Sequence, residues 1–227
     1  MRPAVFLDRD GTLIEESGYL DRLERLIFFP FSVDAVRVLN RAGFAVVVIT
    51  NQAGIARGIV EEPFVAEAHR HIAARLEAGG ASIDGFYYCP HYPAGTVEKY
   101  RTTCDCRKPQ PGMLHRAAVD LDLDLPRSFV VGDRWHDLAA GHAVGARGVL
   151  VRTGIGRRDE ETPHPGTTPD AIADNLMDAA AWILQQPFDV AQGRPFDGAQ
   201  GRPFDGAQDR PFDGAQGRPF DGAQGRP

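Results

Sequence analysis

The sequence predicts an α/β protein with a doubly wound, mostly parallel sheet. Short apolar runs alternate along the chain with longer segments whose apolar residues recur at helical spacing. One of these runs, FAVVVIT (44–50), is apolar and mostly β-branched, which is typical of a strand buried on both faces. Strands and helices that alternate in this way form parallel sheets with helices on both faces, and ligands bind at the carboxyl ends of the strands.

The predicted elements follow one another through the first 186 residues. Strands are expected at 3–7, 44–50, 83–88, 128–133 and 148–154. Helices are expected at 32–42, 62–78, 111–123, 135–146 and about 175–184. Ser32 is expected to cap the first helix and Gly43 to end it. The residues of that helix expected to face the core are Val33, Val36, Val38 and Leu39.

The end of the chain differs in kind from the rest. Residues 187–226 repeat an eight-residue phrase of the form PFDGAQGR, with one phenylalanine in each copy. Burial of one large apolar residue per copy cannot offset the entropy of ordering the backbone. We therefore expect a disordered tail. The sequence therefore predicts one domain over 1–186, followed by a nonessential tail over 187–227. The near-identical copies suggest duplicated DNA.

Composition limits the classes of function. The chain has 227 residues, of which 43% are hydrophobic, and a formal net charge of -6. An acidic chain is a poor candidate for binding nucleic acid, and no apolar run approaches the length of a membrane span. The N-terminus MRPAVFLDRDG does not resemble a secretory signal, and the few cysteines favour a reducing compartment. We expect a cytoplasmic monomer.

Two aspartates follow the first predicted strand, in the run FLDRDGTL. Asp8 comes directly after the strand and Asp10 two residues later, with Gly11 and Thr12 allowing a turn. Carboxylates this close repel each other unless a cation lies between them, which predicts a Mg²⁺ site. A metal-bound aspartate can attack phosphorus, and a second carboxylate can transfer the proton. The alternative is an ordinary Asp-Gly turn.

Hydrogen-bond donors and cations follow the next strands. The run VVVITNQAG places Thr50 and Asn51 at the same edge of the sheet, where both side chains can donate to phosphate oxygens. Arg107 and Lys108 follow the last cysteine. Lysine is a compact charge suited to a phosphoryl group, and arginine can bind a second anion with two parallel hydrogen bonds. Taken singly, these residues could be a solvated strand end and an exposed basic pair.

A third acidic segment, SFVVGDRWHD, ends another strand. Asp133 is the natural further Mg²⁺ ligand. Asp137 has two possible roles: it supports the metal site from behind, or it is an acidic residue favoured at the start of a helix. His136 lies in this acidic loop, where contact with substrate is possible, but a solvated or packed ring is the favoured interpretation. The same interpretation is applied to His69, His71, His115, His142 and His164.

All three cysteines of the chain lie in one stretch, CPHYPAGTVEKYRTTCDCRKP, at 89–109. Cys89 and His91 form one close pair, and Cys104 and Cys106 form another. Two close ligand pairs joined by a loop are the general plan of a structural zinc site. Four protein ligands would leave no position for a catalytic water. The alternative is three unrelated thiols and a surface histidine, which the confinement of every cysteine to this loop disfavours.

The order D-x-D-G-T, T-N, K-P and G-D-x-x-x-D at four strand ends resembles the haloacid dehalogenase superfamily of phosphohydrolases. The resemblance implies Asp8 as nucleophile, Asp10 as general acid/base, and Thr50 and Lys108 as groups that stabilise the phosphoryl group. It implies Mg²⁺ held by Asp8, the backbone carbonyl of Asp10, and Asp133. It also implies a Rossmann-like fold, here with a zinc-binding loop and without a large cap domain.

Within that superfamily, the cysteine loop, FLDRDGTL and VVITNQAGIARG resemble the D-glycero-D-manno-heptose 1,7-bisphosphate 7-phosphatase family over about residues 4–184. The resemblance implies a small phosphorylated sugar that loses its 7-phosphate through an aspartyl-phosphate. Arg134 stands where these enzymes commonly carry lysine, so the charge is kept and its shape differs. The implied substrate-binding residues are Glu16, Ser17, Gly18, Tyr19, Asn51, Gln52, Ala53, Arg107 and Arg134.

Three alternative functions stay open at this point. Histidinol-phosphate phosphatase domains share the same plan of motifs and differ in substrate. A phosphotransfer mutase is less favoured, because it needs a cap that shields the aspartyl-phosphate from water. A non-enzymatic zinc-binding interaction module accounts for the cysteine loop but leaves Asp8, Asp10 and Asp133 unexplained.

Overall fold

A parallel sheet with helices on both faces forms the protein in the computed structural model, which describes residues 1–162, 164–186 and 218–219. The predicted α/β class is therefore confirmed. The strands are β1 (Ala4–Leu7), β2 (Ala45–Asn51), β3 (Gly85–Cys89), β4 (Phe129–Gly132), β5 (Arg147–Val151), β6 (Ala171–Ala173) and β7 (Arg218–Pro219). Their order across the sheet is β6-β5-β4-β1-β2-β3-β7, and every neighbouring pair is parallel.

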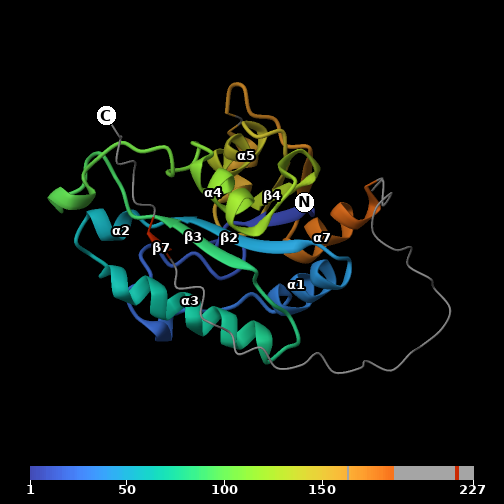
Figure 1. Cartoon of the computed structure of the whole chain (residues 1–227), viewed down its shortest axis with the longest axis horizontal. Helices are drawn as coiled ribbons and strands as arrows, with labels where there is room; N and C mark the ends of the chain where they lie inside the picture. The colour runs from blue at the N-terminus through green and yellow to red at the C-terminus, as the bar shows by residue number, and fades with distance from the viewer. Residues whose placement is uncertain (163, 187–217, 220–227) are drawn as a thin grey trace.

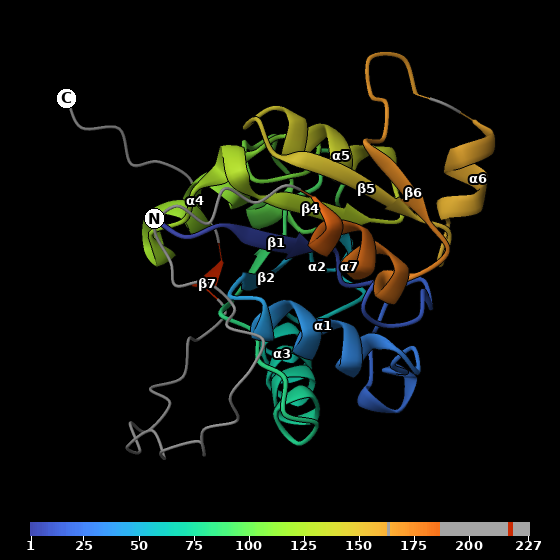
Figure 2. The same ribbon diagram turned by 90° about the vertical axis from the view of Figure 1, so that its right-hand side faces the viewer.

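The helices form two layers, one on each face of the sheet (Figures 1 and 2). One layer holds α1 (Ser32–Arg41), α3 (Glu62–Glu77) and α7 (Leu176–Gln185), and the other holds α4 (Gly112–Leu121) and α5 (Trp135–His142). The shorter helical segments are α2 (Ala53–Ala56), α6 (Gly156–Glu161), η1 (Leu23–Arg25), η2 (Glu98–Tyr100) and η3 (Leu125–Arg127).

Alternation along the central strands divides the core in two. In β1, Val5 and Leu7 face the layer of α1, α3 and α7, whereas Ala4 and Phe6 face α4 and α5. Every residue of β1 and the first six of β2 are buried, because helices cover both faces. The sheet is thus rigid at its centre, and the loops at the carboxyl ends of β1, β2 and β4 are anchored to it.

Several predicted details are corrected by the structure. Ser32 does not cap α1: it is the first helical residue, and its hydroxyl donates to the carbonyl of Leu13 over 2.6 Å. Of the residues expected to face the core, Val36 and Leu39 are buried, while Val33 and Val38 are only half-buried. The strand β6 was missed because a three-residue edge strand has too few residues to show a pattern.

The predicted tail lies almost entirely outside the described residues. The exception is β7, whose two residues pair with Tyr87 and Tyr88 of β3 at the edge of the sheet. The division into a domain and a disordered tail stays a prediction. Between 1 and 186, the described residues contain no large cap domain, and no helix there is long and apolar enough to cross a membrane.

Candidate active site and cysteine-histidine cluster

Parallel strands bring the predicted residues to one edge of the sheet. Leu7 pairs with Val48 on one side and with Val131 on the other, so the segments that follow β1, β2 and β4 end side by side. Asp8 continues from β1, Thr50 is the second-last residue of β2, and Asp133 follows β4. The long loop after β3 carries the basic residues across to the same edge. The convergence expected from the strand pattern is therefore observed.

Lys108 lies at the centre of this edge. Its ammonium donates to Asp8 Oδ1 over 2.7 Å and to the carbonyl of Ile49 over 2.8 Å, and it lies 2.7 Å from Asp137 Oδ1. The residue is only 3% exposed. Burial opposes its charge, but the attraction of Asp137 and Asp8 outweighs this and raises the pKa of Lys108 to about 12. The ammonium therefore stays charged at neutral pH.

Asp133 joins the two carboxylates that contact this ammonium in one acidic cluster. Oxygens of Asp8, Asp133 and Asp137 lie within 4.8 Å of one another, and all three residues are buried. Burial raises the pKa of Asp8 to about 6, with Lys108 partly opposing the shift. Burial and the charge of Asp8 raise the pKa of Asp133 to about 8. The cluster therefore carries more negative charge than the protein itself compensates.

A divalent cation fits this donor set. Asp133 accepts a hydrogen bond from the backbone of Ile155 through Oδ2, over 2.8 Å, but its buried Oδ1 has no hydrogen-bond partner among the described residues. Carboxylate oxygens are the ligands that Mg²⁺ prefers, and a cation would supply the missing compensation. Asp8 and Asp133 lie where such an ion would bind. Asp137 contacts Lys108, a role the sequence left open.

Two glycines allow the chain to pack against Asp133. Gly11 has a φ of +83° and Gly154 a φ of +55°, in the region that favours glycine. A side-chain carbon at either position would collide with the carboxylate of Asp133. The D-x-D-G-T turn therefore needs its glycine for conformation and for space. The same turn holds Asp10 beside the cluster.

Asp137 also fixes the start of α5. Its Oδ2 accepts a hydrogen bond from the backbone of Arg134 over 3.1 Å. The helix-start interpretation therefore holds, and the other oxygen of Asp137 faces Lys108. Asn51 has a similar bracing contact: its side-chain amide exchanges two hydrogen bonds of 3.1 Å with the backbone of Lys108.

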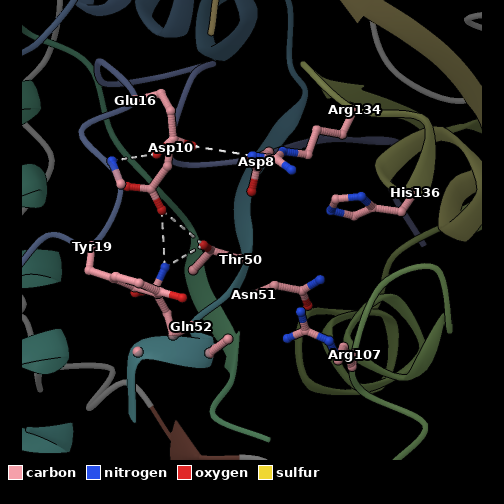
Figure 3. Close-up of a pocket in the computed structure, with 13 residues that line it drawn as sticks. Asp8, Asp10, Glu16, Tyr19, Thr50, Asn51, Gln52, Arg107, Arg134 and His136 are labelled. Carbon is pink, nitrogen blue, oxygen red and sulfur yellow. Dashed lines mark hydrogen bonds and ion pairs between the residues drawn. The ribbon is translucent and has the colours of Figure 1, made fainter. Parts of the chain in front are cut away.

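A cleft of about 330 Å³ opens in front of the cluster (Figure 3). Gly54, which the sequence missed, lines the cleft, and so does His136, whose ring packs against Trp135. Ser17 does not line it; its carbonyl accepts from Arg25 instead. Lys108 and Asp133 lie behind the lining. The predicted residues that line the cleft are Asp8, Asp10, Glu16, Gly18, Tyr19, Thr50, Asn51, Gln52, Ala53, Arg107 and Arg134.

One wall of the cleft is basic. Arg107, Arg134 and His136 lie together on the side opposite Tyr19 and Gln52 (Figure 3). Burial and repulsion by Lys108 lower the pKa of His136 to about 3, so this ring is neutral at neutral pH. The two guanidinium groups therefore provide the positive charge of the wall.

Contacts at the mouth of the cleft hold these cations in place. Arg134 lies 3.8 Å from the carboxylate of Glu16, whose other oxygen accepts from the backbone of Gly18 over 2.7 Å. Burial and repulsion by Asp10 raise the pKa of Glu16. Arg107 donates to the carbonyl of His91 over 3.2 Å and lies 5.1 Å from the ring centre of Tyr92. Arg107 is thereby tied to the cysteine loop.

The cysteine loop gathers its four predicted ligands. Cys106 Sγ lies 3.1 Å from the sulfurs of both Cys89 and Cys104, and 3.4 Å from Nδ1 of His91. Cys89 and Cys104 are 3.5 Å apart at sulfur. A tetrahedral zinc with bonds of about 2.3 Å would separate its sulfurs by about 3.8 Å, so a small outward movement of the sulfurs would admit the ion. The four residues therefore fit a closed structural zinc site.

Comparison with known proteins identifies what this architecture is similar to. A family model described as HAD-hydrolase-like matches residues 105–179. The D-glycero-beta-D-manno-heptose-1,7-bisphosphate 7-phosphatase of Escherichia coli K12 is 42% identical over 186 residues, which cover 81% of this chain and 95% of that protein. The protein of the same name from Photorhabdus laumondii is 44% identical over 154 residues, covering 67% and 81%.

Solved structures of heptose bisphosphate phosphatases are also similar to this chain. The D,D-heptose 1,7-bisphosphate phosphatase from B. bronchiseptica, crystallised with magnesium and phosphate, matches with a TM-score of 0.72 and 33% identity, covering 82% of this chain and 99% of that one. The D,D-heptose 1,7-bisphosphate phosphatase from Burkholderia thailandensis matches with a TM-score of 0.60 and 28% identity, covering 82% and 100%.

Proposed function

Because the chain belongs to the D-glycero-beta-D-manno-heptose-1,7-bisphosphate 7-phosphatase family and is a phosphoric monoester hydrolase, we propose that it removes the 7-phosphate of that heptose bisphosphate. The observation that carries the proposal is the charge layout of the cleft. One cationic group, Lys108, lies at the base beside Asp8, and two guanidiniums lie on the wall. A substrate with two phosphates matches that layout. Family membership leaves the non-enzymatic zinc module without support.

Asp8 is the proposed nucleophile. One carboxylate oxygen attacks phosphorus, forming the aspartyl-phosphate as the bond from phosphorus to the sugar oxygen breaks. Asp10, which begins the cycle protonated, donates the proton that the departing sugar oxygen needs. Asp10 then takes a proton from water, whose oxygen attacks phosphorus and breaks the bond to Asp8. Phosphate leaves, and both carboxylates return to their starting state.

Thr50 and Lys108 would stabilise the phosphoryl group during both steps. The hydroxyl of Thr50 lies near the end of β2, and the Lys108 ammonium donates a hydrogen bond to Asp8 Oδ1. Positive charge and fixed donors are worth most where negative charge develops in a site shielded from water. Mg²⁺, held by Asp8, Asp133 and the backbone carbonyl of Asp10, would add charge compensation at the phosphate oxygens.

The rest of the cleft would hold the sugar and its second phosphate. Arg107 and Arg134 are the proposed partners of that phosphate, because a guanidinium can bind two phosphate oxygens at once. The loop Glu16–Tyr19, with Asn51, Gln52 and Ala53, faces the space between the two anionic ends; within that loop Ser17 contributes no lining atom. Zinc bound by the cysteine loop would hold Arg107 and Lys108 in position at the cleft. The enzyme is proposed to act as a cytoplasmic monomer.

A substrate panel tests the proposal. Phosphate release is measured with Mg²⁺ from D-glycero-D-manno-heptose 1,7-bisphosphate, the corresponding 7-monophosphate and histidinol phosphate. The bisphosphate should have the highest kcat/KM, and Arg107→Met should reduce the preference for the bisphosphate over the monophosphate. A higher kcat/KM on histidinol phosphate would overturn the substrate assignment. The molar mass of the purified protein, measured by light scattering, tests whether it is a monomer in solution.

A further inference from the structure

Arg9 is a buried cation to which the proposed chemistry gives no role. It lies between the two catalytic aspartates in sequence and is only 1% exposed, the largest fully buried side chain among the described residues. A charge taken out of water is costly unless it is paired and hydrogen-bonded. Its contacts therefore indicate what the residue does.

The guanidinium of Arg9 is directed at Asp10. Its Nε donates to Asp10 Oδ1 and Oδ2 over 3.2 and 3.1 Å, and its Nη2 donates to Oδ1 over 3.0 Å. Donation from two nitrogens of one planar group to both oxygens fixes the plane of the carboxylate as well as its position. The carboxylate of Asp10 is 16% exposed, so Arg9 holds it from the buried side.

Gln52 completes the arrangement. Its carbonyl oxygen accepts from Arg9 Nη2 over 3.0 Å, and its amide nitrogen donates to Asp10 Oδ2 over 3.1 Å and to Thr50 Oγ1 over 2.8 Å. Figure 3 shows the Asp10 carboxylate directed at Gln52 and Thr50. Arg9, Asp10 and Gln52 thus form a closed ring of hydrogen bonds at the cleft.

We propose that Arg9 is a positioning residue that holds the Asp10 carboxylate in the orientation needed for proton transfer. The inference rests on the proposed role of Asp10 as the general acid/base. A carboxylate with two free torsions samples many directions, and a displacement of about 1 Å at a reacting group can cost roughly 10²-fold in rate. The ring limits that freedom from behind, and the cleft side of Asp10 stays open to substrate.

A second buried residue keeps this pairing undisturbed. His69 faces the region of Arg9; burial, and then the charge of Arg9, hold the pKa of His69 well below its usual range. The imidazole is therefore neutral at neutral pH and brings no second cation into the site.

The leaving group of the substrate distinguishes positioning from a merely structural role. An alkyl phosphate, such as a sugar phosphate, needs a proton from Asp10 when its oxygen departs, whereas 4-nitrophenyl phosphate releases a stable anion that does not. Arg9→Met should lower kcat/KM for the alkyl phosphate by about 10²-fold and for the aryl phosphate by only about threefold or less. Arg116→Met, at an exposed arginine of α4, should change neither.

Two further variants keep the test decisive. Arg9→Lys, which retains the charge but loses the planar fork, should show a smaller selective loss, and it serves alone if Arg9→Met fails to fold. In an Asp10→Asn background, Arg9→Met should cause little additional loss on the alkyl phosphate. Equal losses on both substrates, or no loss on either, would overturn the role of Arg9. Unimpaired alkyl-phosphate turnover by Asp10→Asn alone would instead overturn the proposed role of Asp10.

Discussion

Lys108 and Asp8 are 100 positions apart in sequence, and their charged groups meet at 2.7 Å. The contact joins the loop after β3 to the end of β1, beneath the cleft. It places the proposed nucleophile in direct contact with a cation that also faces Asp137. The proposed nucleophile is therefore oriented from below before any substrate binds.

Asp8→Asn should abolish turnover and leave the fold intact. The substitution removes the attacking oxygen charge, and the amide keeps the size of the side chain. We expect kcat to fall by roughly 10³-fold or more, with thermal unfolding within a few degrees of the original. Asp120→Asn, at an exposed residue of α4, is the control and should retain full activity. Substantial turnover by Asp8→Asn would rule out the aspartyl-phosphate.

Lys108→Met should destabilise the protein strongly. Asp8 and Asp137 would lose their shared cation while staying buried, and an uncompensated buried charge typically costs about 3–5 kcal/mol. Urea unfolding in the presence of a chelator measures the loss. Lys99→Met, at a lysine whose side chain is 73% exposed, should change the free energy of unfolding far less. Similar effects of the two substitutions would contradict the central role of Lys108.

The gathering of these residues could be predicted because parallel strands deliver their carboxyl ends to one edge. Asp8, Thr50 and Asp133 each follow a recognisable apolar run, so their meeting follows from the fold class alone. The contact between Lys108 and Asp137 could not be predicted, because it depends on the direction of two side chains from separate loops. The cysteine loop was found from spacing, since close pairs of ligands need no knowledge of the surrounding fold.

Other residues carry no signal that the sequence alone reveals. An arginine between two aspartates in a turn is usually exposed to solvent, so the sequence does not predict that Arg9 is buried. Its role is inferred only from its hydrogen bonds with Asp10 and Gln52. His136 lines the cleft because α5 begins at Trp135, two residues after Asp133, and periodicity does not fix such a boundary to one residue. Ser32 follows the rule for a cap but bonds to Leu13 through tertiary packing.

His69 should make stability depend on pH. It is 3% exposed, and burial lowers its pKa well below the ordinary value of 6.5. The unfolded chain then binds the proton more readily, so the stability is present above pH 6.5 and is lost as the pH falls below it. Relative to His69→Phe, which keeps a ring stacked on Phe86, the original protein should lose up to about 1.4 kcal/mol per pH unit between about pH 6.5 and 5.

Urea unfolding of both proteins at pH 7.5 and 5 measures this difference. His71→Phe is the matched control, because His71 lies on the same helix and is exposed. The difference in free energy of unfolding between the original protein and His71→Phe should be nearly the same at both pH values. If the two substitutions behave alike, His69 does not titrate as a buried base.

Cys106→Ser should lower both zinc content and stability. One sulfur of the four-residue cluster would be lost, and a hydroxyl is a poor replacement for a thiolate in a zinc site. We expect Tm to fall by about 6 °C, which corresponds to roughly 2–3 kcal/mol for a chain of this size. Elemental analysis measures the zinc content, and thermal unfolding measures Tm. Wild-type protein stripped of zinc should unfold at a similar temperature, and an unchanged Tm after stripping would contradict the structural role.

Removal of the repeated tail is the last test, since the division into a domain and a nonessential tail is still a prediction. A chain ending at Gln186 loses β7, whose two residues pair with the edge of β3. Proline has no N–H to donate, so Pro219 adds little to the ladder, and the central strands keep all their other partners. Tm and kcat/KM should therefore match those of the full chain. Aggregation of the truncated protein, or lost turnover, would show that β7 protects the edge of the sheet and that the tail belongs to the domain.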